Sequence, residues 1–169
     1  MGRVMKALAI IVLLVTIAGA GTLLYAVNNL SPAVVQQSVL VTPAQQAQEI
    51  FDAAADQLAS ETFTGRVFAD ASGLDAQNCA FVTYTVRLEN KGFFPAEWVS
   101  LDIHPAGQAD VCQLDNYSAN VLASRTQGDI AATVLTSSDA ADAPRAYTIT
   151  CYVFGQKIVL DGVIGETTD

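Results

Sequence analysis

The residues of this sequence best suited to covalent or metal chemistry are three cysteines and a single histidine. Cys79, Cys112 and Cys151 form no Cys-x-x-Cys pair and no cysteine–histidine spacing typical of a zinc site. In an exported chain they allow one disulfide and one remaining thiol, with Cys112 joined either to Cys79 or to Cys151. They equally allow three small, buried apolar residues without any disulfide.

The histidine, His104, stands alone at the end of a predicted strand. A Ser-His-Asp or Cys-His site needs a base that a carboxylate orients beside a nucleophile, and no recognised nucleophile motif occurs here. The acidic pairs Asp110/Asp115 and Asp139/Asp142 lack the dense spacing of a calcium loop and are predicted to lie in solvated turns. We therefore predict no catalytic residue, no metal ligand and no cofactor, and we do not expect an enzyme.

The overall charge argues against one class of partner. Among 169 residues, 8 are basic and 17 are acidic, which gives a formal net charge of −9. Nucleic-acid binding relies on a basic surface, so nucleic acid is not an expected partner. The hydrophobic fraction is 51% and the charged fraction only 15%. Much of this apolar excess lies in one N-terminal block, which has to be considered separately from the rest.

Residues 7–27 form that block, with no charged residue and no side-chain amide. As a helix the block would be about 30 Å long, which matches the hydrocarbon core of a bilayer. Arg3 and Lys6 precede it, and the next charged residue is Glu49. The positive-inside rule then predicts a cytoplasmic N-terminus at residues 1–6, a single transmembrane helix in the cell membrane, and an extracytoplasmic remainder.

A cleaved signal peptide is the alternative interpretation of the same block. Ala18, Gly19 and Ala20 would form the cleavage site, and the chain would be secreted after a cut near Ala20. The apolar run continues through residues 22–27, as a membrane span requires and secretion does not, so the anchor is favoured. Both interpretations export the remaining chain.

Residues 28–42 lack charge and clear periodicity, and we predict a linker there, with residues 33–41 either extended or in a short helix near the membrane. Thr42 and Pro43 give a helix start signal, with Thr42 as the N-cap and Pro43 in the first turn. The amphipathic helix predicted over residues 43–60 would pack its apolar side on the domain or, alternatively, on a partner. That side comprises Ala47, Ile50, Phe51, Ala54 and Leu58.

From residue 62 the pattern changes to the alternation typical of β-strands. In the clearest strand the residues expected to face the core are Ala80, Val82, Tyr84, Val86 and Leu88. A turn at residues 90–92 leads to a return strand at residues 98–103. Further strands are predicted at residues 111–114, 120–124, 130–136, 146–154 and 157–164. We therefore predict a mainly β protein, an antiparallel immunoglobulin-like sandwich over residues 62–165 with a tail at residues 166–169.

The segment 80–103 resembles bacterial extracytoplasmic sandwich domains of the CARDB and fibronectin type III-like kind. The residues that carry the resemblance are Asn90, Gly92, Pro95 and Ala96, together with the flanking alternating strands. The resemblance implies a β-sandwich used as a spacer, an adhesive module or an assembly part. It supplies no catalytic residues.

Outward-facing residues of the two predicted strands suggest a contact patch. Thr83 and Thr85 belong to the first strand, and Ser100 and an exposed anchor, Trp98, belong to the second. A plain three-residue turn would place the core-facing side chains of one strand on the same side as the outward-facing side chains of the other. Either a longer loop or a bulge must therefore correct the register. A bulge that turned Trp98 inward would remove the patch.

The function expected from these features is that of a membrane-anchored extracytoplasmic sandwich that acts as a structural or protein-interaction module. Its protein partner is not identified by the sequence. The alternative is a carbohydrate-binding or small-ligand-binding accessory domain of an envelope complex. A concave patch of Trp98, Tyr152 and Phe81 would favour that alternative.

Overall fold

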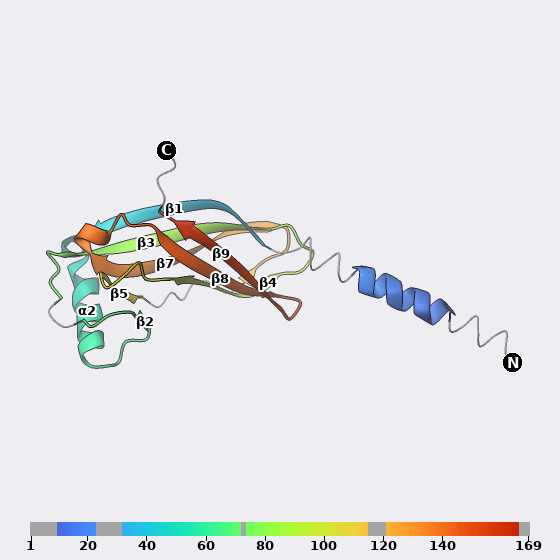
Figure 1. The fold of residues 1–169 in the computed structure, drawn as a ribbon, viewed down its shortest axis with the longest axis horizontal. Helices are drawn as coiled ribbons and strands as arrows, with labels where there is room; N and C mark the ends of the chain where they lie inside the picture. Colours follow the sequence, from blue (N-terminus) through green and yellow to red (C-terminus); the bar gives the residue numbers. More distant parts are fainter. Residues whose placement is uncertain (1–9, 23–31, 72–73, 115–120, 166–169) are drawn as a thin grey trace.

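The computed structural model describes residues 10–22, 32–71, 74–114 and 121–165. Two antiparallel β-sheets pack face to face and form an elongated sandwich, with a helix across one end (Figure 1). This arrangement confirms the mainly β, antiparallel sandwich that the alternating sequence pattern predicts.

The five-stranded sheet contains, in spatial order, β1 (Ala33–Pro43), β3 (Cys79–Asn90), β7 (Thr126–Ser137), β5 (Asp110–Gln113) and β2 (Arg66–Val67). The four-stranded sheet contains β6 (Val121–Leu122), β4 (Ala96–Ile103), β8 (Arg145–Val153) and β9 (Gln156–Ile164). A short 3₁₀ turn, η2 (Ser138–Ala140), joins β7 to β8 across the two sheets.

The main core lies between the sheets and is supplied by alternate residues of each strand. The residues of β3 predicted to face inward are all buried there: Ala80, Val82, Tyr84, Val86 and Leu88. From β4, Val99, Leu101 and Ile103 reach the same core. A second, smaller cluster lies on the outer face of the five-stranded sheet and includes Phe51 and Phe81. The two clusters explain why β3 is buried on both faces at its first residues.

The predicted linker at residues 28–42 is wrong from residue 33 onward, because β1 begins there. β1 pairs antiparallel with β3 along nearly its whole length, from Ala33 opposite Glu89 to Pro43 opposite Ala80. The sandwich therefore starts before the helix and not at residue 62. The segment carries no alternation that marks a strand, because most of its side chains are exposed at the edge of the sheet.

The predicted amphipathic helix is present as η1 (Ala44–Ala47) followed by α2 (Gln48–Ala59). Its expected cap is wrong: Pro43 occupies the N-cap position in an extended conformation, and no side chain caps the turn. Phe51 is buried against the outer face of the five-stranded sheet, as expected, Ala54 is also buried, and Leu58 is half-buried. Ile50 instead points away from the sheet and is exposed.

The predicted hairpin between residues 80–90 and 98–103 is also wrong. β3 and β4 belong to different sheets, so the segment after Asn90 crosses from one sheet to the other. β4 pairs instead with β8 and with β6, and its register with β8 shifts between Glu97 and Ser100. The sequence predicts a longer loop or a bulge between the two strands. A bulge is present, but it lies at Trp98 and affects the pairing of β4 with β8 rather than with β3.

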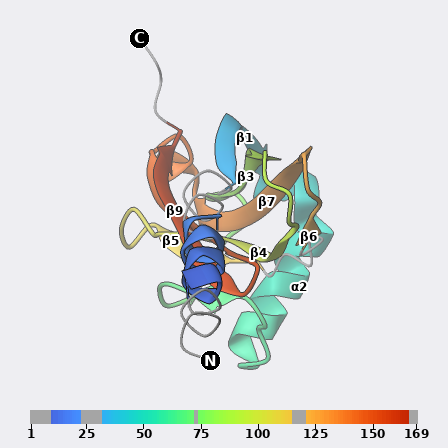
Figure 2. The ribbon, with the colours of Figure 1, turned by 90° about the vertical axis from the view of Figure 1, so that its right-hand side faces the viewer.

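β8 and β9 form a tight hairpin. Val153 pairs with Gln156, so the two turn residues are Phe154 and Gly155. Both have positive φ, 50° and 74°, as a type I′ turn requires. Figure 2 turns the end of the sandwich that carries this hairpin toward the viewer.

The N-terminal part of the described chain is a separate helix over residues 10–22, with its side chains exposed. Among the described residues, no helix combines the length and the apolarity that a membrane crossing requires. The other residues of the predicted 7–27 span lie outside the described residues. So do the predicted cytoplasmic residues 1–6, the start of the predicted linker up to residue 31, and the predicted tail at 166–169.

Candidate functional site

The longest exposed polar backbone edge of the sandwich belongs to β1, which pairs on one side with β3 and, within the described residues, with no strand on its other side. Residues 33–48 contain no charged side chain. Several apolar side chains of β1 are open to solvent: Leu40 is 64% exposed, Val39 39% and Val41 38%. An edge strand of this kind is a template for pairing with another strand.

The other sheet edges in the described part of the chain are protected in ways that β1 is not. β2 and β6 have only two residues each. β9 is longer but carries Lys157 and Asp161, and edge charges discourage strand addition. β1 has two protective features, one at each end: a register shift between Val34 and Gln36 and a proline, Pro43, as its last residue. The regular, uncharged part of its edge therefore runs from residue 36 up to Pro43.

β1 is held in place from the interior of the sandwich as well as by β3. Val34 packs against the main core, and Gln37 Nε2 donates a 2.8 Å hydrogen bond to Tyr147 Oη on β8 of the opposite sheet. Because both sheets hold the strand, its free edge is presented in a fixed geometry, and a partner strand would find the edge already ordered.

The contact patch predicted from the sequence is not assembled. Thr83 and Thr85 lie on the outer face of the five-stranded sheet, where Thr83 Oγ1 lies 2.9 Å from Thr133 Oγ1. Trp98 and Ser100 lie on β4 of the other sheet. Trp98 does point outward and is 67% exposed. The prediction failed because it placed both strands in one hairpin.

The aromatic set proposed for a ligand site is not assembled either. Phe81 is buried in the cluster beneath η1 and α2, at the end of β3 opposite to the end that lies near Trp98. Tyr152 lies opposite Glu97 on the outer face of the four-stranded sheet. Phe81 therefore cannot share a concave surface with Trp98 and Tyr152.

All three cysteines are free and buried. Cys79 and Cys112 pair with residues of β7 from its two opposite sides, so two strand spacings, about 9–10 Å, separate them. A disulfide needs Cα atoms within about 7 Å. Cys151 lies in the main core, whereas Cys112 lies in the second cluster. Burial raises the pKa of the Cys112 thiol to about 12 and also raises those of Cys79 and Cys151.

His104 lies at the exposed end of β4 and joins a short chain of polar contacts. Its Nε2 lies 2.8 Å from Thr148 Oγ1, and that hydroxyl donates a 2.6 Å hydrogen bond to Asp161 Oδ1. The hydroxyl stands between the imidazole and the carboxylate, whereas in a Ser-His-Asp site the imidazole stands in the middle. The hydroxyl proton is directed to Asp161, so this order does not make Thr148 a nucleophile activated by His104.

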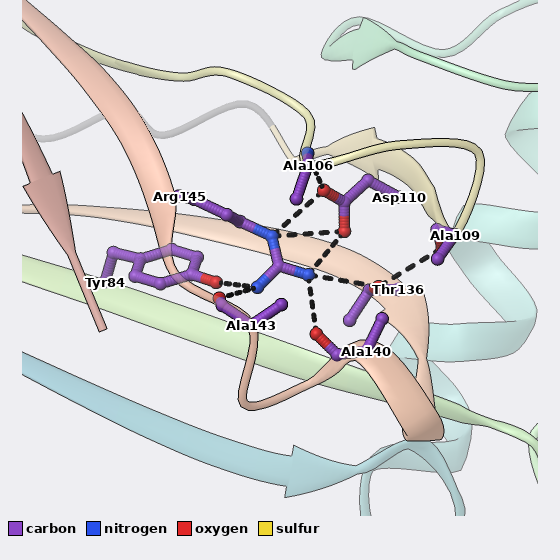
Figure 3. A network of polar contacts seen from close by, with 8 residues as sticks. All are labelled: Tyr84, Ala106, Ala109, Asp110, Thr136, Ala140, Ala143 and Arg145. Carbon is purple, nitrogen blue, oxygen red and sulfur yellow. Dashed lines mark hydrogen bonds and ion pairs between the residues drawn. The ribbon is translucent and has the colours of Figure 1, made fainter. Parts of the chain in front are cut away.

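The most extensive polar network is buried and was missed from the sequence (Figure 3). Asp110, predicted to lie in a solvated turn, is fully buried and accepts hydrogen bonds from Arg145 Nε at 2.9 Å and Nη2 at 2.6 Å. Arg145 also donates to the Ala140 and Ala143 carbonyls and to Tyr84 Oη. Burial opposes the ionised Asp110, but the hydrogen bonds from Arg145 and from the Ala106 amide outweigh it and lower the pKa of the carboxyl.

This network stabilises the end of the sandwich that lies near α2, and all of its polar side-chain atoms have partners. The sequence gives little indication of this network, because neither Asp110 nor Arg145 lies in a recognisable motif. A register shift between Asp110 and Cys112 turns Asp110 toward the interior, and alternation alone does not reveal such a shift. Across the described ranges, no group of three or more His, Cys, Asp or Glu side chains is arranged to hold a metal ion.

Comparisons with known proteins give little further identification. No protein-family model matches this sequence, and no curated protein matches it. Among solved structures, the crystal structure of the GAE domain of GGA2p from Saccharomyces cerevisiae aligns with 82% of this chain and 99% of that chain. The two are 8% identical, with a TM-score of 0.39.

Proposed function

We propose that this chain is a membrane-anchored, non-catalytic protein that displays a β-sandwich outside the cytoplasm and binds a protein partner by strand addition at β1. The observation that carries the proposal is the uncharged, exposed edge of β1. In strand addition the main-chain hydrogen bonds supply affinity, and alternate side chains of the edge supply specificity.

The proposed occupant is an extended, uncharged protein segment rich in β-branched residues. Such a segment would continue the sheet beside residues 36–43 and cover Val39, Leu40 and Val41, which are open to solvent. The edge carries no charge that a charged segment could match, and the domain as a whole is acidic. A nonpolar strand therefore suits the edge better than an acidic or basic peptide does.

The anchoring part of the proposal rests on the sequence. Residues 7–27 carry no charge, Arg3 and Lys6 precede them, and no charged residue follows before Glu49. These features favour an uncleaved span with the sandwich outside. The resemblance of residues 80–103 to CARDB and fibronectin type III-like domains supports the non-catalytic part of the proposal, because display and assembly modules of that kind need no catalytic residues.

Site-specific photocrosslinking in native membranes tests the strand-addition surface. We expect a photoreactive residue at position 40, on β1, to form a discrete adduct with one protein. The same residue at Val159, on the edge of β9 and 47% exposed, is the matched control and should give no such adduct. Equal adducts at both positions, or none at position 40, would contradict the proposal.

A charge placed on the edge should abolish the adduct without unfolding the domain. We expect Val41→Lys to remove the adduct at position 40, because an edge lysine opposes strand pairing. The control Val163→Lys places the same charge on β9 and should leave the adduct unchanged. The location outside the cytoplasm is tested separately: in sealed vesicles of known orientation, protease must digest the sandwich only from the extracytoplasmic side.

A further inference from the structure

One end of the sandwich carries most of its exposed aromatic surface. It is the end at which β1 begins and β3 finishes, since Ala33 lies opposite Glu89. The exposed aromatic side chains there are Phe93 (66% exposed), Phe94 (40%), Trp98 (67%) and Phe154 (68%). We call these four residues the aromatic tip. They come from three separate segments: the loop after β3, the start of β4, and the β8–β9 turn.

Strand pairing brings those segments together. Ala96 lies opposite Val153 on one side and opposite Leu122 on the other. The rings of Phe94 and Phe154 are 5.0 Å apart, centroid to centroid. The Arg125 guanidinium lies 4.4 Å from the centroid of the Phe93 ring. Phe93, Phe94 and Phe154 are therefore gathered at one end of the sandwich, and Trp98 lies on the neighbouring part of β4.

A buried asparagine fixes the loops that carry the tip. Asn90, the last residue of β3, is fully buried. Its Nδ2 donates to the Phe94 carbonyl at 2.9 Å and to the Ala123 carbonyl at 3.1 Å, and its Oδ1 accepts from the Gly92 amide at 2.9 Å. This is the asparagine turn that the sequence indicates, with the additional role of joining two loops. The fixed loops hold Phe93 and Phe94 out in solvent.

Three large residues at this end of the sandwich have a strained backbone. Trp98, Arg125 and Phe154 have φ values of 53°, 56° and 50°. Non-glycine residues rarely adopt positive φ, and the strain clusters at functional positions. Three of the four such residues in the described chain lie at this one end. A purely structural turn would be better served by glycine or asparagine at these positions.

Charge is distributed unevenly along the sandwich. The tip carries three basic residues, Lys91, Arg125 and Lys157, beside two acidic ones, Glu89 and Glu97. Glu89 is already paired with Lys91 at 3.1 Å. The elements near the opposite end carry one exposed base, Arg66 on β2, which is paired with Asp102 at 3.0 Å. Their other exposed charged residues are acidic: Glu49, Asp52, Asp56, Glu61, Asp70, Asp75, Asp139 and Asp142. An anionic surface would therefore attract the tip and repel the other end.

The covalent chain also places the tip nearest to the apolar segment. From Val27 to Ala33 the chain can extend at most about 22 Å. β3 has 12 residues and so extends for about 40 Å. If residues 7–27 span the bilayer, the tip is held close to its surface, and the acidic end is held away from it. Figure 1 shows β1 beginning at the end of the sandwich that faces residues 10–22.

We infer that the aromatic tip inserts into the interfacial region of the lipid bilayer, with Lys91, Arg125 and Lys157 at the level of the lipid headgroups. This inference rests on the proposed membrane anchor and adds a second, shallow contact that orients the sandwich. Aromatic rings flanked by basic residues are typical of membrane interfaces. The docked tip would hold the long axis away from the membrane plane and leave the β1 edge accessible.

Trp98 is the single tryptophan of the chain, so intrinsic fluorescence reports on the tip alone. The full chain is reconstituted into vesicles of phosphatidylcholine and phosphatidylglycerol, with increasing fractions of lipid brominated near the headgroup end of the acyl chain. We expect Trp98 emission to be blue-shifted and to lose intensity as the brominated fraction rises. Emission that stays red-shifted and unquenched in reconstituted protein would overturn the inference.

A relocated tryptophan provides the matched control. In the double variant Trp98→Phe/Val67→Trp the reporter lies on β2, at the opposite end of the sandwich, where Val67 is 57% exposed. We expect its emission to be that of tryptophan in water and unaffected by brominated lipid. Equal quenching at both positions would show that the sandwich lies flat or is buried nonspecifically, and it would overturn the inference.

Carbonate extraction of the same vesicles separates this inference from the proposed anchor. Chain that resists extraction but shows unquenched Trp98 retains the anchor and contradicts the docked tip. Chain that is extracted, yet shows quenched Trp98 before extraction, contradicts the anchor and supports the tip as an independent membrane contact. Extracted chain with unquenched Trp98 overturns both.

Discussion

Asp110 and Arg145 form an ion pair that is entirely withdrawn from solvent, with side-chain exposures of 1% and 0% and an Nη2–Oδ1 distance of 2.6 Å. The pair joins β5 of one sheet to β8 of the other, across 35 residues of sequence. At the opposite end of the sandwich, Asn90, the last residue of β3, joins the loops of the tip. Each end of the sandwich is therefore closed by a buried polar side chain with satisfied hydrogen bonds.

Removal of one partner of the ion pair should lower the free energy of unfolding far more than replacement of both partners does. We expect Asp110→Ala to lower the free energy of unfolding by about 3–5 kcal/mol, because it leaves the Arg145 charge buried without compensation. The measurement is urea denaturation followed by circular dichroism. The double variant Asp110→Leu/Arg145→Met should be less destabilised than Asp110→Ala. A double variant that loses as much as the two single variants added together would contradict the coupling.

The same pair should make the stability of the sandwich depend on pH on the acidic side. The pKa of Asp110 is lower in the folded chain than its ordinary value, so the ionised carboxylate favours the folded state. That contribution is fully present above the unfolded pKa of about 3.9 and is lost as pH falls through the lower folded pKa. Denaturation between neutral pH and strongly acidic pH should show the loss.

The variant Asp110→Asn identifies the source of this pH dependence. Its stability should vary less with pH below about 4 than that of the native chain. The control is Asp129→Asn, which removes an exposed partner of Arg87 at 2.6 Å and should change the profile little, because exposed ion pairs contribute little. An unchanged profile in Asp110→Asn would show that other carboxyl groups determine the acid sensitivity.

The elements predicted well from sequence are those in which one physical signal dominates. Strict alternation over Ala80 to Leu88 identifies the inner face of β3, because a one-residue slip would expose every apolar side chain. The apolar spacing of Phe51 and Ala54 identifies the buried side of α2. In both cases local pattern and tertiary burial agree.

The failures arise where tertiary pairing determines the outcome. β1 is an exposed edge, so its side chains follow no buried–exposed alternation. Its strand conformation depends on pairing with β3, from Pro43 opposite Ala80 to Ala33 opposite Glu89, which are far apart in the sequence. The crossing of the chain between sheets after Asn90 cannot be distinguished from a hairpin turn by composition alone. The inward turn of Asp110 depends on a register shift. In the aromatic tip, Phe154 lies about sixty residues after Phe93, Phe94 and Trp98 in the sequence, and only the fold brings it to them.

The three buried cysteines should be unreactive in the folded chain. Burial raises the pKa of each thiol, that of Cys112 to about 12, so the reactive thiolate is scarce at neutral pH and poorly accessible. We expect a thiol reagent such as dithionitrobenzoate to label the folded chain hardly at all. After denaturation without reductant it should label all three cysteines.

The labelling experiment needs a positive control and has a clear contrary result. Ser100→Cys places a thiol on the outer face of β4, and it should react rapidly in the folded chain. If the unfolded native chain yields a single thiol, two of the cysteines form a disulfide, and the separation of Cys79, Cys112 and Cys151 in the folded structure is contradicted.

Replacement of Phe154 in the β8–β9 turn should stabilise the fold and weaken the proposed membrane contact. Phe154 and Gly155 form the β8–β9 turn with positive φ at both positions, and asparagine tolerates the first position much better than phenylalanine does. We expect Phe154→Asn to raise the free energy of unfolding by about 0.5–1 kcal/mol, measured by urea denaturation. The same substitution removes one ring of the aromatic tip and should weaken the quenching of Trp98 by brominated lipid. A variant that is stabilised but shows undiminished quenching would mean that Phe154 lies outside the membrane contact. A variant that is destabilised would mean that packing of Phe154 against Phe94 outweighs the strain of its backbone.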